Sequence, residues 1–399
     1  MISIKISNRE IEVDREKAIK YMHDLLRLMV QKNGSDLFIT AGAVPSMKVD
    51  GTMTPLSNQS LSPQHTQVLV GSIMNDKQRA EFDETQECNF AISLPGVSRF
   101  RVNAFTQRGS VGIVLRVIRS EIPKLEDLNL PSVLKDISMT KRGLVIFVGA
   151  TGSGKSTSLA AMVGYRNENS FGHIITIEDP IEFVHNHKNC IVTQREVGVD
   201  TDNYEIALKN TLRQAPDVIL IGEIRDRETM DHAIAFAETG HLCLSTLHAN
   251  STNQALDRII NFFPEDRRQQ LLMDLSLNLK SLISQRLIPT ASGDGRIAAI
   301  EIMINSPLMS DLIFKGQVHD IKELVAKSNE LGMQTFDQAL FDLYENGQIK
   351  YEDALRNADS VNDLRLRIKL EGKESKDSDL MEGLDNIQME EHDDKSRLR

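Results

Sequence analysis

One stretch of this 399-residue chain fits the phosphate-binding pattern G-x-x-x-x-G-K-[ST] without a mismatch. In such a loop the glycines let successive backbone N–H groups turn inward onto the β-phosphate of a nucleotide. Lys155 would reach the β and γ oxygens, and the Ser156 hydroxyl would hold Mg²⁺. The predicted phosphate-binding residues are Gly149, Ala150, Thr151, Gly152, Ser153, Gly154, Lys155, Ser156 and Thr157. The pattern therefore predicts a nucleotide site, with ATP and Mg²⁺ as its ligands.

The segments on either side of this loop support that interpretation. Residues 144–148 are all apolar and predict a short buried strand. Residues 157–162 predict the start of a helix, whose N-terminal dipole attracts anions. A strand, a glycine-rich loop and a helix in this order are the setting in which the pattern binds phosphate.

Three carboxylates follow the next predicted strand. They belong to Glu178, Asp179 and Glu182, and Pro180 stops the strand from continuing, so that the acids stay at its tip. A carboxylate beside a γ-phosphate can orient and deprotonate the attacking water. A solvated acidic turn would contain the same residue types, and that alternative stays open from these residues alone.

Another acid ends the apolar run at residues 218–221. This run is similar to a Walker B strand, but Gly222 stands where Asp is commoner, and Glu223 follows. Glu223 is therefore the nearest candidate to bind Mg²⁺, through water. The alternatives are that Glu223 is itself the catalytic base, or that it is a structural acid at the strand end.

Histidines bracket residues 241–248. Thr246 and His248 are expected beside the γ-phosphate, because an imidazole or hydroxyl hydrogen-bonds differently to ATP and to ADP plus phosphate. Taken singly, His241 and His248 are equally typical of histidines that only pack.

Arginines gather on the last strands predicted in the first part of the chain: Arg99, Arg101, Arg108, Arg116 and Arg119. Arg99 and Arg101 alternate and so share one face of a strand. A guanidinium presented to a γ-phosphate stabilises transition-state charge, and it can come from another subunit. Surface ion pairs are the alternative.

A zinc site is not expected. Residues 185–190 read H-x-H-x-x-C, but no fourth ligand is near in sequence, and we interpret the segment as a polar hairpin. Cys88, Cys190 and Cys243 are scattered singly, which predicts buried reduced thiols.

The chain is long enough for two domains and a tail. Residues 1–120 predict a small α+β domain, with a helix over 16–32, a helical stretch over 63–82, and strands over 35–40, 46–50, 89–94, 98–105 and 111–118. Residues 121–370 predict an α/β domain with a mostly parallel sheet and its active face at the strands' carboxyl ends. Its strands are expected over 144–148, 173–177, 218–221 and 241–247, followed by a helical end region that includes 267–287.

Composition and charge narrow the classes of function that this chain could have. The formal net charge is -11, and residues 371–399 hold ten Asp and Glu against five Lys and Arg, so a disordered acidic tail is expected. No run approaches the roughly 18 apolar residues of a spanning helix, and residues 1–5 lack the apolar core of a signal peptide, so a cytoplasmic protein is expected. The acidic balance, the 5% aromatic content and the lack of Trp argue against a nucleic-acid partner.

Together, the four boxes at residues 149–156, 176–182, 217–226 and 240–248 resemble the secretion-ATPase superfamily, and within it the PilT/PilU retraction motors of bacterial type IV pili. Residues 35–37 and 98–105 also look like this family. The acidic tail and the poor match of residues 307–315 to the A-I-R-N-L-I-R-E stretch of PilT-like members resemble the PilU branch, whose members are accessory motors beside PilT.

The resemblance implies a PAS-like first domain, a RecA-like P-loop ATPase domain and a homo-hexamer with ATP bound between subunits. It implies that Lys155 and Ser156 bind phosphate and Mg²⁺, that Glu182 is the catalytic acid, and that Glu223 is the Walker B acid. His241 and His248 would form the His box, and Arg99, Arg101 and Arg116 would complete the site.

The function implied is an ATP-hydrolysing motor for pilus retraction and twitching motility. Its implied partners are a PilT-like ATPase and a pilus platform protein of the inner membrane, where the chain would be peripheral. A RecA-like nucleic-acid translocase and a nucleotide-binding regulator with little turnover are the alternatives.

Overall fold

The structure is a computed structural model, which describes residues 8–49, 51–118 and 121–372. Its helices are α1 (Asn8–Gln31), α2 (Pro63–Ser72), α3 (Asp76–Thr85), α4 (Val133–Ser138), α5 (Lys155–Asn169), α6 (Tyr204–Thr211), α7 (Arg227–Glu238), α8 (Thr252–Asn261), α9 (Arg268–Asn278), α10 (Pro307–Phe314), α11 (Val318–Lys327), α12 (Phe336–Glu345), α13 (Tyr351–Asn357) and α14 (Val361–Glu371). The tail expected over 371–399 lies outside the described residues from position 373 onward.

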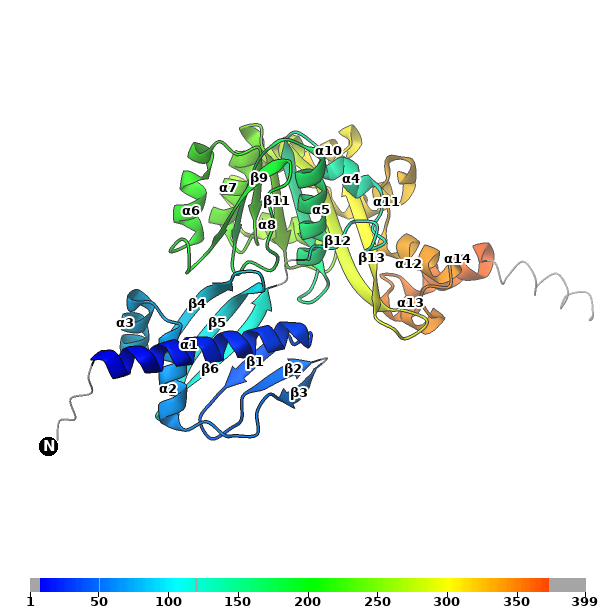
Figure 1. Cartoon of the computed structure of the whole chain (residues 1–399). Helices are drawn as coiled ribbons and strands as arrows, with labels where there is room; N and C mark the ends of the chain where they lie inside the picture. The colour runs from blue at the N-terminus through cyan, green and yellow to red at the C-terminus, as the bar shows by residue number, and fades with distance from the viewer. Residues whose placement is uncertain (1–7, 50, 119–120, 373–399) are drawn as a thin grey trace, which may run out of the picture. The chain divides into compact units, whose positions relative to one another are not determined.

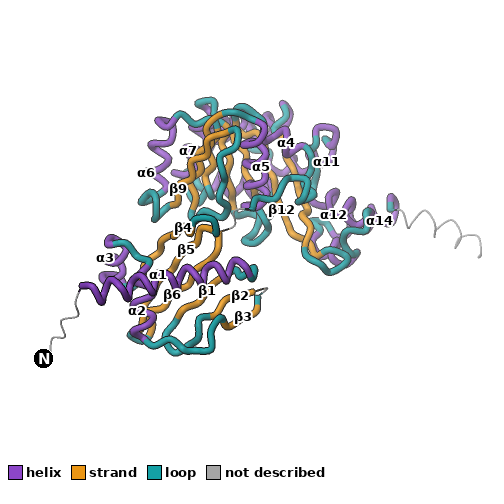
Figure 2. The backbone as a smooth tube through the Cα atoms, in the orientation of Figure 1, coloured by secondary structure: helices purple, strands orange, loops and turns teal. Residues whose placement is uncertain are grey.

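The strands form two sheets (Figure 2). The first has six strands in the order β3-β2-β1-β6-β5-β4, and the second has seven in the order β13-β12-β7-β11-β10-β8-β9. Their bounds are β1 (Asp36–Ile39), β2 (Ser46–Val49), β3 (Thr52–Pro55), β4 (Glu87–Leu94), β5 (Ser98–Gln107), β6 (Ser110–Ile118), β7 (Gly143–Val148), β8 (Gly172–Glu178), β9 (Cys190–Glu196), β10 (Val218–Ile221), β11 (Leu242–Leu247), β12 (Leu279–Pro289) and β13 (Arg296–Ile304).

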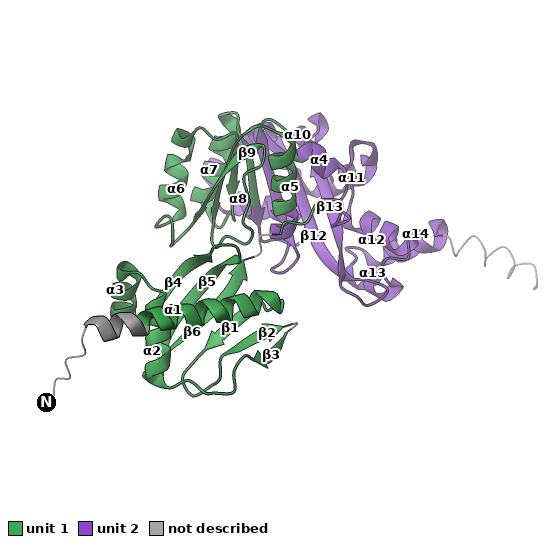
Figure 3. Cartoon of the chain, in the orientation of Figure 1, with its two compact units in different colours: residues 1–124, 138–142, 159–245 green, residues 125–137, 143–158, 246–399 purple. Residues whose placement is uncertain are grey.

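Two compact units make up the chain (Figure 3). Unit 1 contains residues 138–142, 159–245 and the described part of 1–124, and unit 2 contains residues 125–137, 143–158 and the described part of 246–399. The domain boundaries expected at residues 120 and 370 stay predictions.

The six-stranded sheet of unit 1 is antiparallel, and α1 lies across one of its faces (Figure 1). Met22, Leu26 and Met29 recur at helical spacing in α1 and are fully buried against the sheet. The helix ends before Asn33, which has φ +54°, and Gly34, where a Cβ would lie 2.8 Å from Met29 Cγ. This confirms the small α+β domain predicted from the first part of the sequence.

One predicted helix of this domain is in fact two. The single helical stretch expected over 63–82 is wrong, because Asn75 starts a new helix. Its side chain accepts a hydrogen bond from the Gln78 backbone N–H, and the Gln78 side chain accepts one from the Asn75 N–H, a reciprocal cap that favours a helix start over helix continuation.

In the seven-stranded sheet, all four strands predicted from the sequence are present and mostly parallel. Every residue of β7, β10 and β11 is buried, as expected for parallel strands covered on both faces. The hairpin expected near residues 185–190 is wrong: β8 and β9 are parallel, so that the segment between them is a crossover connection.

The helix expected over 267–287 is also wrong in its second half. Helix α9 ends at Asn278, and β12 follows, paired with β7 on one side and with β13 on the other. Two neighbouring strands satisfy its backbone, so tertiary pairing overrides the helical spacing of its leucines. On these strands of unit 2, Ile288 and Ile297 pack with Phe336 and Leu340 of α12 in a second apolar core.

Candidate active site

The phosphate-binding loop lies in unit 2 between β7 and α5. Gly152 and Gly154 have φ of +77° and +88°, which side chains other than glycine rarely adopt. Lys155 is buried, and its Nζ donates hydrogen bonds of 2.7 and 2.9 Å to the carbonyl oxygens of Gly149 and Ala150. The Lys155 side chain therefore points back into the phosphate-binding loop, as the sequence pattern predicts.

Gln285 of β12 supports this loop and was not identified from the sequence. Its Nε2 donates to the Ser153 carbonyl oxygen at 2.9 Å, and its Oε1 accepts from the Ser158 hydroxyl at 2.8 Å. A Cβ at Gly154 would lie 2.6 Å from Gln285 Nε2, so the third glycine of the loop is required for this contact. An amide inside an apolar segment is the available signal, but the leucine spacing of this segment predicts a helix.

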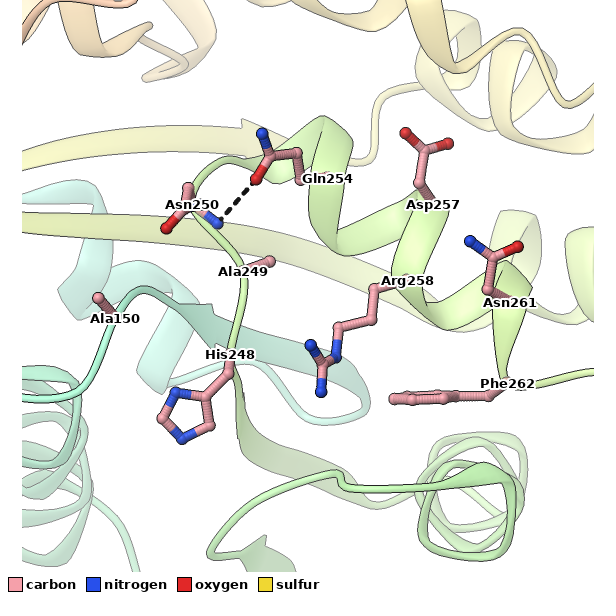
Figure 4. A pocket seen from close by; sticks show the side chains of 9 residues that line it. All are labelled: Ala150, His248, Ala249, Asn250, Gln254, Asp257, Arg258, Asn261 and Phe262. Atoms are coloured by element: carbon pink, nitrogen blue, oxygen red, sulfur yellow. Dashed lines mark hydrogen bonds between the residues drawn. The ribbon is translucent and has the colours of Figure 1, made fainter.

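His248 follows β11 and lines a pocket of about 510 Å³ in unit 2 (Figure 4). Ala150 of the loop lies on the same pocket, and α8 contributes Arg258, whose guanidinium points toward the His248 side of the pocket. Arg258 also lies over the Phe262 ring, with Cζ 5.8 Å from its centroid. The structure therefore brings His248 and the loop residue Ala150 to one pocket.

Helix α8 begins on a buried carboxylate. The Thr252 backbone N–H donates to Glu301 Oε2 at 2.8 Å, and Glu301, on β13, is only 2% exposed. Burial raises the pKa of Glu301 to about 7; the hydrogen bond from Thr252 opposes the rise, and the Asp359 carboxylate adds to it. In either protonation state, the Glu301 carboxyl can accept the Thr252 hydrogen bond at the start of the helix that lines the pocket.

The predicted acids at the ends of β8 and β10 lie in unit 1. Glu178 accepts hydrogen bonds from the Thr176 hydroxyl at 2.6 Å and from Gln194 Nε2 at 3.2 Å. Burial raises the pKa of Glu178 to about 7, although these bonds and one from the Glu182 backbone oppose the rise. Glu182 itself is exposed, so that of these two acids it is the one open to solvent.

Arg225 joins two of the predicted acids. Its Nε pairs with Glu223 Oε1, and its Nη1 lies 3.1 Å from Asp179 Oδ2. These carboxylates, the Glu223 hydrogen bond first, raise the pKa of Arg225, which stays charged. The ends of β8 and β10 are therefore bridged by a cation that lies two residues after Glu223 in sequence.

The unusual Gly222 has a steric cause. A Cβ on this residue would lie 2.9 Å from Tyr204 Oη, 3.1 Å from Glu178 Cα and 3.3 Å from the Ile177 carbonyl oxygen. The Tyr204 hydroxyl and the two backbone atoms leave little room for a side chain, which favours glycine at the Walker B position before Glu223.

The predicted arginines have separate partners in unit 1. Arg99 Nη2 lies 3.7 Å from Glu196 and 3.9 Å from Asp200, and Arg116 Nε lies 2.6 Å from Asp36 Oδ1. Arg101 pairs in register with Arg116 between β5 and β6. Arg108 occupies the turn between these strands with φ +48°, and Arg119 lies outside the described residues.

The remaining predicted side chains have structural surroundings. His241 Nδ1 forms hydrogen bonds of 3.0 Å with Thr239 Oγ1 and 3.2 Å with the Phe236 carbonyl oxygen, at the end of α7. Cys88, Cys190 and Cys243 are free and buried, as predicted. In the described part of the chain, no group of three or more His, Cys, Asp or Glu side chains is arranged to hold a metal ion.

Within residues 8–49, 51–118 and 121–372, no helix is both long and apolar enough to cross a bilayer.

A glycine-rich loop between a buried strand and a helix, with acids at the ends of parallel strands, defines a P-loop nucleotide hydrolase. The chain belongs to the family described as Type II/IV secretion system protein, whose model matches residues 12–339.

Relatives within this family are similar over nearly their whole length. The Type IV pilus ATPase PilU of Pseudomonas aeruginosa is 65% identical over 362 residues, which are 90% of this chain and 95% of that protein. The Type IV pilus retractation ATPase PilT of the same organism is 44% identical over 84% of this chain and 97% of its own. The crystal structure of the pilus retraction motor PilT with bound ADP superimposes with a TM-score of 0.81 at 40% identity, covering 86% of this chain and 99% of that one.

These similarities confirm several predictions from the sequence. The fold is a RecA-like P-loop ATPase domain preceded by a small α+β domain, and the chain is an ATPase of the PilT/PilU family. Its similarity to the PilU relative exceeds that to the PilT relative, as the sequence resemblance indicated.

Proposed function

We propose that this chain is an ATP-driven motor that assists type IV pilus retraction and twitching motility. The observation that supports it most is the intact phosphate-binding loop, closed on Lys155 and held by Gln285, in a chain 65% identical to a PilU. The motor would act as a homo-hexamer beside a PilT-like ATPase, in the cytoplasm at a pilus platform protein of the inner membrane. No nucleic-acid or zinc partner enters this proposal.

The loop would bind the nucleotide. Residues 149–157 would surround the phosphates with backbone N–H groups, and Lys155 would exchange its two loop carbonyls for phosphate oxygens. The donor set suits Mg²⁺, because Ser156 is exposed at the start of α5 and the Glu223 side chain is 21% exposed. The ion would supply charge neutralisation at the phosphates.

The acids and histidines would complete the chemistry. Glu182, exposed beside Glu178, would orient and deprotonate the attacking water, with Glu223 as the alternative base. His248 would respond to the γ-phosphate, and His241 would hold the start of β11. Arg99, Arg101 and Arg116 would stabilise transition-state charge, each leaving its present surroundings to do so.

The test is complementation of a deletion strain. We expect wild type to restore twitching and sensitivity to pilus-specific phage, and Lys155→Ala to restore neither fully. Purified Lys155→Ala should release no phosphate from ATP, while Glu182→Gln and Glu223→Gln bind nucleotide but turn it over slowly. Full rescue by Lys155→Ala would show a scaffolding role, and stimulation of wild-type turnover by single-stranded DNA would favour a translocase.

A further inference from the structure

The hydroxyl of Tyr204 is enclosed among acids. Tyr204 is the first residue of α6, and its Oη is buried with no hydrogen-bond partner in the structure. Burial raises the pKa of the Tyr204 phenol well above its ordinary value, and Asp179, Glu223 and Glu178 raise it further. The Arg225 guanidinium opposes this rise without cancelling it, so the phenol stays protonated and is an unused hydrogen-bond donor.

The position of this hydroxyl is fixed by Gly222. The space that a side chain at residue 222 would take is occupied by Tyr204 Oη, 2.9 Å from an ideal Cβ. A Walker B strand that ends in Asp-Glu carries a polar side chain there, whereas this chain carries glycine and brings a phenol from another helix. The Tyr204 hydroxyl thus stands where the Asp carboxylate of such a strand would be, beside the strand end that bears Glu223.

Two of the three carboxylates around Tyr204, those of Asp179 and Glu223, pair with Arg225. The Arg225 side chain is 50% exposed, and it spans Glu223 and Asp179. An exposed arginine on a flexible stem can leave for solvent or for a phosphate at a modest cost. The Tyr204 hydroxyl is enclosed by protein and cannot leave in this way.

We propose that Tyr204 is a positioning residue for ATP hydrolysis: its hydroxyl donates a hydrogen bond to the Asp179 carboxylate whenever Arg225 releases that carboxylate. The bond would hold the loop between β8 and Glu182 in place. This inference rests on the proposed roles of Glu182 and Glu223. Tyr204 touches neither nucleotide nor water in it.

The first test is Tyr204→Phe, which removes only the hydroxyl. We expect kcat for ATP to fall about tenfold, as for a lost hydrogen bond to a charged group, with KM changed less than about twofold. The melting temperature should not fall, because the variant removes a buried polar atom that has no partner. Tyr21→Phe, on an exposed side chain of α1, is the matched control and should match wild type in both measurements.

A double-mutant cycle tests the acceptor. In an Asp179→Asn background, Tyr204→Phe should lower kcat by less than about twofold, since the bond's charged partner is already gone. Independent losses that multiply would overturn the assignment to Asp179. Unchanged kcat in Tyr204→Phe, or a lowered kcat together with a lowered melting temperature, would overturn the positioning role.

A spectroscopic test is independent of turnover. The chain has 5 Tyr and no Trp, so that the absorbance difference between wild type and Tyr204→Phe isolates one phenol. That difference should show no phenolate band at pH 10 to 11, where ordinary tyrosines ionise. A band there would place Oη in water and refute the inference.

The same measurements distinguish an error in the role of Tyr204 from an error in the proposed active site. If Glu223→Gln and Glu182→Gln both keep wild-type turnover, the proposed site is wrong whatever Tyr204→Phe does. If those variants are inactive and Tyr204→Phe is fully active, only the inference about Tyr204 fails.

Discussion

Replacing Glu301 by Gln should make the stability of this protein less dependent on pH. The pKa of Glu301 is raised from 4.5 to about 7 in the folded chain, chiefly by burial, with Asp359 adding to the rise and Lys322 opposing it. A carboxyl group with a higher pKa in the folded state binds more protons there than in the unfolded state. Folding stability therefore falls as the pH rises from about 4.5, and the loss is complete above about 7.

The size of the effect follows from the shift. Each pKa unit corresponds to about 1.4 kcal/mol, so that the ionised form of Glu301 costs about 3 kcal/mol of folding stability above neutral pH. Gln has the shape of the protonated acid and can accept the same Thr252 N–H hydrogen bond through Oε1. We expect Glu301→Gln to equal wild type near pH 4.5 and to exceed it by up to about 3 kcal/mol at pH 8.

Thermal melting at pH 5, 6, 7 and 8 checks this expectation. For a chain of this length, about 3 kcal/mol should raise the melting temperature at pH 8 by roughly 4 °C, and the difference at pH 5 should be only about 1 °C. Glu178 titrates in the same range, but it is present in both proteins and cancels in the difference. Glu330→Gln, on an exposed side chain, is the control and should melt like wild type at each pH. Parallel melting curves for Glu301→Gln and wild type across this range would refute the reasoning.

Three further outcomes are expected. Gln285→Ala should lower the free energy of unfolding by about 2 to 4 kcal/mol and raise KM for ATP, because two buried hydrogen bonds of Gln285 are lost. Urea denaturation measures the first effect, and steady-state phosphate release measures the second. Gly222→Ala should cost about 1 to 3 kcal/mol by overpacking against Tyr204 and backbone, and a melting temperature equal to wild type would contradict the contact. Burial raises the pKa of Cys88 to about 11 and that of the other two thiols as well, so a thiol reagent at pH 8 should label the native chain hardly at all and all three cysteines after denaturation.

The sequence predicted those parts of the site that lie together along the chain. The loop at residues 149–156 is one continuous motif, and the apolar runs before each acid identify the strands without ambiguity. Gln285 was missed because its segment has leucines at helical spacing and becomes a strand only between β7 and β13. Tyr204 was missed because its meaning depends on Gly222, and no local pattern connects a helix start with a distant strand end.

The charged groups of the candidate site are neutralised by the chain itself, and this sets what a nucleotide must do on binding. Lys155 donates to two carbonyls of its own loop, and Arg225 pairs with Glu223 and Asp179. In the proposed function, ATP would exchange one set of hydrogen bonds for another at Lys155, and its affinity would be a difference between the two sets. The buried lysine would lose two neutral acceptors and gain charged ones, which would favour the exchange. If Arg225 releases Asp179, that carboxylate loses a charged donor. In our proposal, the enclosed phenol of Tyr204 is the donor that unit 1 provides in its place.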